Sequence, residues 1–72
     1  MADTITIEFN GRGTDVAGDC TVESLVCALT GSSEAAGIAV AVNREVVPRS
    51  DWKGFRVSEG DRVEVLTPAQ GG

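Results

Sequence analysis

The chain has 72 residues, of which 6 are basic and 11 acidic, and its formal net charge is −5. A domain of this length buries only about 60% of the surface that its unfolded chain exposes, which leaves little room for an enclosed active site. The acidic balance argues against nucleic-acid binding, because Lys and Arg contacts to phosphate supply most of that affinity. A function performed at the surface or at a terminus is therefore favoured.

The sequence carries no signal for a membrane. The first ten residues, MADTITIEFN, have neither a basic segment nor an apolar run of the signal-peptide kind. The longest uncharged apolar run, residues 37–42, is much shorter than the roughly 20 residues that a spanning helix needs. We therefore expect a cytoplasmic protein that binds no membrane.

The two cysteines, Cys20 and Cys27, lie seven positions apart around a predicted helix start. Seven residues of helix rise about 10 Å, which exceeds the roughly 7 Å limit between the Cα atoms of a disulfide. The sequence also has no histidine and no Cys-x-x-Cys motif. It therefore predicts two reduced thiols and neither a zinc nor a redox site.

The first half of the chain reads as a hairpin followed by a helix. Residues 4–9 alternate between apolar and polar side chains, which predicts a half-buried strand. Residues 10–13, Asn-Gly-Arg-Gly, predict a turn, and residues 14–17 a returning strand. Thr21 can cap a helix that Gly31 closes. Between them, one apolar stripe with helical spacing is formed by Val22, Leu25, Val26 and Leu29.

The second half predicts three more strands. Residues 38–42 are apolar on both faces, which is typical of a central strand, with Ala39 and Ala41 outward. A turn at Asn43-Arg44 leads to a short edge strand, residues 45–47, which Pro48 ends. Residues 49–55 are expected to be irregular, with the single tryptophan covering the sheet edge. Residues 62–66 form the last strand, with Val63 and Val65 inward and Leu66 outward.

These elements predict an α+β fold. A single helix must lay its apolar stripe across one face of a sheet, because it cannot cover itself. We expect a mixed sheet of four to five strands with the helix packed across one face. Residues 1–72 then form one domain, and residues 67–72 a flexible C-terminal tail beyond the last strand.

The side chains predict no catalysis and no bound cofactor. The chain lacks a histidine for general-base chemistry, and neither cysteine has a neighbour in sequence that would activate it. The stretch Gly11-Arg12-Gly13 lacks the lysine and the spacing of a phosphate-binding loop. The acidic residues are scattered singly, as on a solvated surface. We expect that the protein is not an enzyme by itself.

The C-terminal sequence Thr-Pro-Ala-Gln-Gly-Gly is the remaining candidate for chemistry. Two residues without Cβ, Gly71 and Gly72, can pass through a narrow channel and bring backbone close to another enzyme's active site. Five or six extended residues reach roughly 17–20 Å from the sheet. The Gly72 carboxylate is inert as it stands, but as an acyl-adenylate its carbonyl carbon becomes an electrophile. Attack by sulfur would then leave a thiocarboxylate.

Several motifs together resemble a known family. They are the run at residues 37–43, Val-Val-Pro-Arg at residues 46–49 with Trp52, Glu-Gly-Asp at residues 59–61, residues 63–66 and the final Gly-Gly. Over essentially its whole length the chain resembles the thiamine-biosynthesis sulfur carriers of the ThiS family. Gly-Gly and Glu-Gly-Asp are shared with other ubiquitin-like sulfur carriers, including the molybdopterin synthase small subunit. The segment Asn-x-x-Val-Val-Pro-Arg-x-x-Trp resembles the thiamine branch.

The resemblance implies a ubiquitin-like β-grasp fold and a function as a protein co-substrate. An E1-like adenylyltransferase of the ThiF type would adenylate Gly72 with ATP, and Gly71 would help thread the tail. A cysteine desulfurase system or another source would deliver sulfur, which a thiazole synthase of the ThiG type would accept. The free protein is expected to be a monomer. Its expected docking surface, near the tail on the open sheet face, consists of Ala39, Ala41, Leu66, Pro68 and Gln70.

Three alternatives stay open from the sequence. The first is a carrier for molybdopterin or another sulfur pathway. The second is a ubiquitin-like modifier joined to lysines, and the third is a binding module with an incidental Gly-Gly. Lys53, the only lysine, argues against chains of this protein on itself but says nothing about other targets. Intact mass after incubation with ATP, an E1-like partner and sulfide separates a thiocarboxylate, a conjugate and no product.

Overall fold

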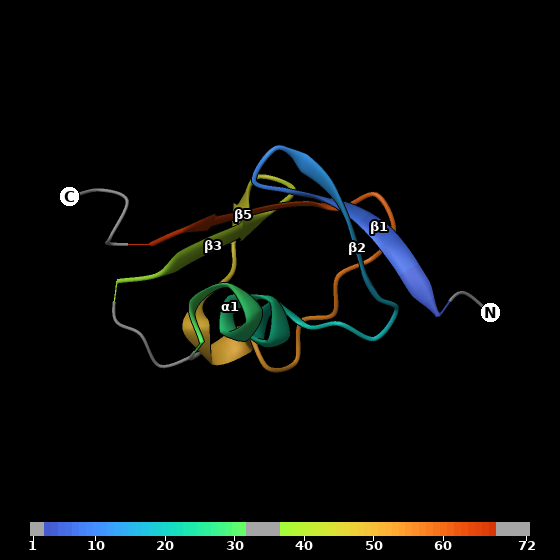
Figure 1. Cartoon of the computed structure of the whole chain (residues 1–72). Coiled ribbons are helices and arrows are strands. Elements are labelled where there is room, and N and C mark those ends of the chain that lie inside the picture. Colours follow the sequence, from blue (N-terminus) through green and yellow to red (C-terminus); the bar gives the residue numbers. More distant parts are fainter. Residues whose placement is uncertain (1–2, 32–36, 68–72) are drawn as a thin grey trace.

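The structure, a computed structural model, describes residues 3–31 and 37–67 (Figure 1). Its elements, in chain order, are β1 (Thr4–Phe9), β2 (Arg12–Ala17), α1 (Val22–Thr30), β3 (Ala39–Val42), β4 (Glu45–Val46), the 3₁₀ turn η1 (Arg49–Asp51) and β5 (Arg62–Leu66). Of the expected tail, only Thr67 belongs to the described residues, and Pro68, Gln70, Gly71 and Gly72 lie outside them.

The strands form one mixed sheet in the order β2-β1-β5-β3-β4. Only the β1–β5 pair is parallel, and the other neighbours are antiparallel. Helix α1 lies across one face, so the expected α+β architecture is confirmed (Figure 1). Strand β3 has a neighbour on each side, as predicted, but the middle strand is β5. The last of the described strands, β5, is therefore held by pairing on both edges.

The β1–β2 hairpin is tighter than the sequence predicted. Asn10 and Gly11 have φ angles of 49° and 85°, which identifies a two-residue turn with both residues in the left-handed region. Pairing therefore starts immediately, with Phe9 opposite Arg12, and the predicted turn at residues 10–13 is too long. The second turn is as expected, since Asn43 and Arg44 also have positive φ angles, 52° and 71°.

Helix α1 has the predicted caps. The Thr21 hydroxyl accepts a hydrogen bond from the Ser24 amide at 3.2 Å, and Gly31, with φ of 84°, donates to the Cys27 carbonyl at 2.7 Å. Of the predicted apolar stripe, the first three residues are buried. Leu29, in the last turn, is 45% exposed, so the stripe meets the sheet only over the first part of the helix.

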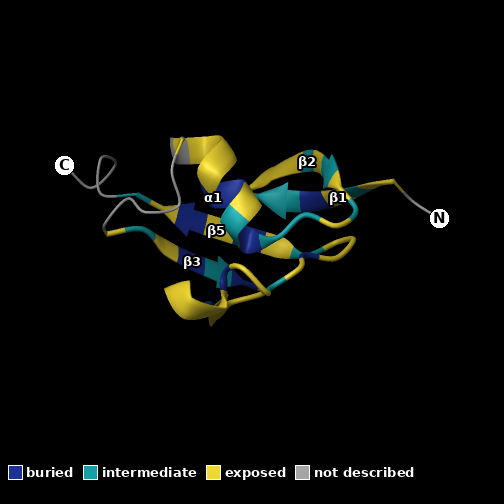
Figure 2. Cartoon of the chain, turned by 90° about the horizontal axis from the view of Figure 1, so that it is seen from below, coloured by how far each residue is buried: buried dark blue, intermediate teal, exposed yellow. Residues whose placement is uncertain are grey.

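The core lies between α1 and the sheet, where dark blue marks the buried residues in a view from the helix side (Figure 2). Strand β5 alternates as predicted, with Val63 and Val65 buried and Leu66 exposed. The connector after β4 contributes Trp52, which is 3% exposed and covers this end of the core. The remaining buried residues are Ile7, Val22, Leu25, Val26, Val40, Val42, Val47 and Val57.

Candidate functional site

The candidate site is the end of β5, because the predicted reactive tail continues from this strand. On one edge, β5 pairs with β3 through Ala39 opposite Leu66 and Val40 opposite Val65. On the other edge it pairs with β1, where Phe9 lies opposite Val63. The strand that leads to the tail is thus fixed by neighbours on both sides.

Three of the five predicted docking residues come together beside this end of β5. Ala39 pairs with Leu66, and Ala41 pairs with Glu64 on the same two strands. All point away from α1, because the alternate residues of both strands are buried in the core. Leu66 is 65% exposed. The other two predicted docking residues, Pro68 and Gln70, lie outside the described residues.

The structure adds Val46, which the sequence analysis did not include. Val46 pairs with Ala41 and is 76% exposed, the most exposed of the large apolar side chains in the described ranges. The sequence pattern could have indicated that Val46 is exposed. Neighbouring residues of a strand point to opposite faces, so an inward Val47 on an edge strand places Val46 outward. We use the name sheet patch for four apolar residues, Ala39, Ala41, Val46 and Leu66. Together with Val40 and Glu64 they line a groove of about 180 Å³.

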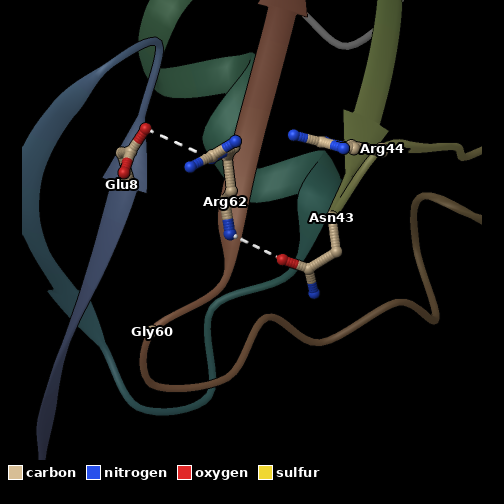
Figure 3. Close-up of a pocket in the computed structure, with 5 residues that line it drawn as sticks. All are labelled: Glu8, Asn43, Arg44, Gly60 and Arg62. Atoms are coloured by element: carbon tan, nitrogen blue, oxygen red, sulfur yellow. Dashed lines mark hydrogen bonds and ion pairs between the residues drawn. The ribbon is translucent and has the colours of Figure 1, made fainter.

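A second, polar cleft of about 320 Å³ lies at the opposite end of β5, where this strand begins (Figure 3). The Arg62 Nε atom lies 3.3 Å from a Glu8 carboxylate oxygen, and both side chains are about half exposed, so this ion pair stabilises the fold by less than about 1 kcal/mol. The Asn43 Oδ1 atom accepts from the Arg62 amide at 2.9 Å, and its Nδ2–H donates to Asp61 at 3.1 Å. These contacts join the β3–β4 turn to β5.

Cys20 does not have the environment of an activated thiol. Cys20 is half-buried and packs against the core, and its thiol donates to the Thr21 carbonyl at 3.5 Å. Burial raises the pKa of the Cys20 thiol, and the negative charge of Asp19 raises it further. Cys27 is exposed, and both thiols are free. A raised pKa disfavours the thiolate, which is the nucleophilic form.

The described part of the chain comprises residues 3–31 and 37–67. Within these ranges, no three side chains of the Cys, Asp, Glu or His type gather as metal ligands would. No helix in these ranges is both long and apolar enough to cross a membrane.

Comparisons with known proteins agree with the motifs in the sequence. The sequence model of the ThiS family matches residues 7–72. The sulfur carrier protein ThiS of Escherichia coli K12 is 33% identical over 66 residues, which cover 92% of this chain and 97% of that protein. The crystal structure of the thiamine biosynthesis protein ThiS from Geobacter metallireducens superposes with a TM-score of 0.73 at 31% identity, covering 86% of this chain and 91% of the other. The β-grasp fold is thereby confirmed.

Proposed function

The chain belongs to the ThiS family of sulfur carriers of thiamine biosynthesis, which are not enzymes, and from this we propose that its Gly72 carboxylate carries the sulfur. A partner of the ThiF type adenylates this carboxylate, and a sulfur source converts the adenylate to a thiocarboxylate. A thiazole synthase of the ThiG type then accepts the sulfur. The observation that carries the proposal is the family match, which extends to Gly72 itself.

The chemistry needs no side chain from the carrier. A carboxylate oxygen of Gly72 attacks the α-phosphorus of ATP, and pyrophosphate leaves. The sulfur of sulfide, or of a persulfide on a donor protein, attacks the acyl-adenylate carbonyl carbon, and AMP leaves. When the donor is a persulfide, a thiol reductant then cleaves the S–S bond. The product is a thiocarboxylate, in which one oxygen of the original carboxylate has been replaced by sulfur.

The exposed sheet patch supports a docking role for the end of β5, which directly precedes the tail in sequence. The sheet patch is apolar and exposed, and its Leu66 is the last residue of β5, directly before the tail. Apolar surface of this kind gains free energy when a partner covers it. We propose that both partners bind the sheet patch together with Pro68 and Gln70, while Gly71 passes through the channel to the active site. The net charge of −5 speeds the encounter with a basic docking face.

Intact-mass spectrometry tests the proposal. The full chain is incubated with ATP, a ThiF-type enzyme and sulfide, and we expect a mass gain of about 16 Da on the C-terminal residue. Omission of ATP, and a chain that lacks Gly71 and Gly72, are the controls and should give no gain. An isopeptide conjugate to lysine would instead identify a protein modifier, and an unchanged mass would identify a binding module.

A second assay separates the sulfur pathways. The purified thiocarboxylate is offered to a ThiG-type thiazole synthase and, in parallel, to the large subunit of a molybdopterin synthase. Transfer to the thiazole synthase supports the thiamine branch. Transfer only to the molybdopterin enzyme would contradict it.

A further inference from the structure

Asn10 makes an unusual contact with the strand that leads to the tail. Its side-chain Oδ1 accepts a hydrogen bond from the Val65 amide at 2.8 Å, and its Nδ2–H donates to the Val65 carbonyl at 3.3 Å. One side-chain amide therefore pairs with both backbone polar groups of one residue. Val65 is the penultimate residue of β5 and lies 55 positions from Asn10 in sequence.

The Asn10 side chain continues the parallel ladder past the end of β1. The Glu8 amide donates to Asp61 and the Asn10 amide donates to Val63, both at 2.9 Å. In a continued parallel ladder, the next bond would run from the Val65 amide to the Asn10 backbone carbonyl. Asn10 instead begins the hairpin turn, with φ of 49°, and its side-chain oxygen accepts that bond.

Among the strands that the structure describes, no other takes this role at Val65. The facing residue on β3, Val40, accepts a hydrogen bond at its carbonyl from the Val47 amide at 2.8 Å, so its polar groups point away from β5. The amide and carbonyl of Val65 therefore point to the β1 side, as the alternation of an antiparallel pair requires. Without the Asn10 amide, both groups would lose the partners that they have among residues 3–31 and 37–67.

We propose that Asn10 is a positioning residue for activation of the C-terminal carboxylate, and this inference rests on the proposed function. By fixing the Val65 peptide, Asn10 sets where and in which direction the chain leaves the sheet. The sheet patch fixes the carrier on its partner, so this direction determines how often the Gly72 carboxylate reaches the adenylation site. Misplacement of a reacting group by about 1 Å can cost up to 100-fold in rate.

The chain offers a matched control in Asn43. Asn43 also has a left-handed backbone, with φ of 52°, and also begins a hairpin turn. Its side-chain amide likewise makes two hydrogen bonds. It accepts from the amide of Arg62, the first residue of β5, and donates to the carboxylate of Asp61, the residue before this strand. The two asparagines therefore differ mainly in place, because Asn43 holds the start of β5 and Asn10 holds its end.

The experiment compares Asn10→Gly with Asn43→Gly in the full chain. Glycine accepts the positive φ at both positions, so each substitution removes the side-chain bonds without adding backbone strain. ATP–pyrophosphate exchange by a ThiF-type enzyme gives kcat and KM for each carrier, and calorimetry without ATP gives the docking Kd. We expect Asn10→Gly to lower kcat by roughly tenfold or more with KM and Kd unchanged. We expect Asn43→Gly to keep the wild-type kcat, although it should lower the thermal midpoint by about as much as Asn10→Gly does.

The variant Asn10→Asp provides a second measurement if Asn10→Gly folds poorly. The aspartate keeps an acceptor for the Val65 amide but loses the donor to the Val65 carbonyl, so its kcat should lie between those of wild type and Asn10→Gly. Equal kcat losses in Asn10→Gly and Asn43→Gly, or a wild-type kcat in both Asn10 variants, would overturn the inference. A wild-type chain that supports no exchange would instead overturn the proposed function, and the inference with it.

Amide hydrogen exchange tests the geometry without any partner. The Val65 amide should exchange about tenfold faster in Asn10→Gly than in wild type or Asn43→Gly, because a part-buried hydrogen bond is lost. An equal Val65 exchange rate in all three proteins would show that Asn10 does not hold this peptide.

Discussion

The indole Nε1–H of Trp52 donates a hydrogen bond of 2.9 Å to the backbone carbonyl of Val47, and both residues are buried. The Arg49 guanidinium lies 5.2 Å from the centre of the same indole ring. The tryptophan thus joins the connector after β4 to the edge of the sheet. This contact ties a segment that contains only one short turn, η1, to the core.

We predict that Trp52→Phe lowers the free energy of unfolding by about 1–3 kcal/mol, because it leaves the buried Val47 carbonyl without a partner. Urea unfolding measures the loss. Adenylation of the carrier should proceed at the wild-type rate, since the indole belongs to the core and not to the sheet patch. Unchanged stability would show that the Val47 carbonyl finds another partner.

We predict that Val46→Asp and Leu66→Asp each weaken docking to a ThiF-type enzyme by roughly tenfold or more, because a charge is placed in an apolar contact. Calorimetric titration measures the Kd. Both side chains are largely exposed, at 76% and 65%, so the thermal midpoint should change little. The control is Leu29→Asp, which changes an exposed leucine on the helix. An equal loss of affinity in this control would contradict a docking role for the sheet patch.

Regular alternation made much of the fold predictable from the sequence. The structure has the inward residues Val63 and Val65 and the helix caps Thr21 and Gly31 as predicted. Strand alternation and helix capping can be read from a few neighbouring residues in the sequence. The length of the first turn was predicted wrongly. Four residues with turn propensity lie together, and only pairing of Phe9 with Arg12 decides which two form the turn.

The candidate site was less predictable, because it depends on contacts between distant segments. Ala39 and Leu66 were placed on one surface correctly, whereas Val46 joins them through the pairing of a strand of only two residues. Asn10 was interpreted as a turn residue alone. Its contact with Val65 requires the parallel β1–β5 pairing, which the local sequence pattern does not determine.

We predict that Cys27 reacts with iodoacetamide faster than Cys20 at neutral pH. Cys27 is exposed, whereas Cys20 is half-buried and its raised pKa keeps the thiol protonated. Peptide mass mapping at increasing times measures both rates.

The double variant Cys20→Ala, Cys27→Ala should still form the thiocarboxylate. A persulfide trapped on either cysteine as an obligatory intermediate would contradict this prediction.

The raised pKa of Cys20 also predicts a pH dependence of stability. The folded state holds the thiol proton more tightly than the unfolded state, so this contribution is present below the ordinary thiol pKa and is lost as the pH rises through the raised value. Wild type should therefore lose stability relative to Cys20→Ala between neutral and strongly alkaline pH. Thermal midpoints of both proteins across this range measure the difference, and parallel curves would contradict it.

We predict that deletion of Gly71 and Gly72 abolishes adenylation and leaves the thermal midpoint within a few degrees of wild type. The described core residue nearest the C-terminus is Val65, and β5 ends at Leu66, so the deletion removes no apolar burial from the described core. Calorimetric scanning and pyrophosphate exchange measure the two properties. A larger fall in the thermal midpoint would show that the last residues contribute to folding.

The substitution Gly71→Ala tests how the tail is used. In the proposed function Gly71 passes through a narrow channel of the partner, where a methyl group would crowd the chain, so the approach of the Gly72 carbonyl to ATP should be impaired. The docking that we propose through the sheet patch does not involve Gly71, so the Kd should stay at the wild-type value. We therefore expect a lower kcat in pyrophosphate exchange at an unchanged calorimetric Kd. A Gly71→Ala carrier that is adenylated at the full rate would show that the absence of Cβ serves no purpose in the channel. A loss of docking affinity equal to the loss of rate would place Gly71 in the docking surface instead.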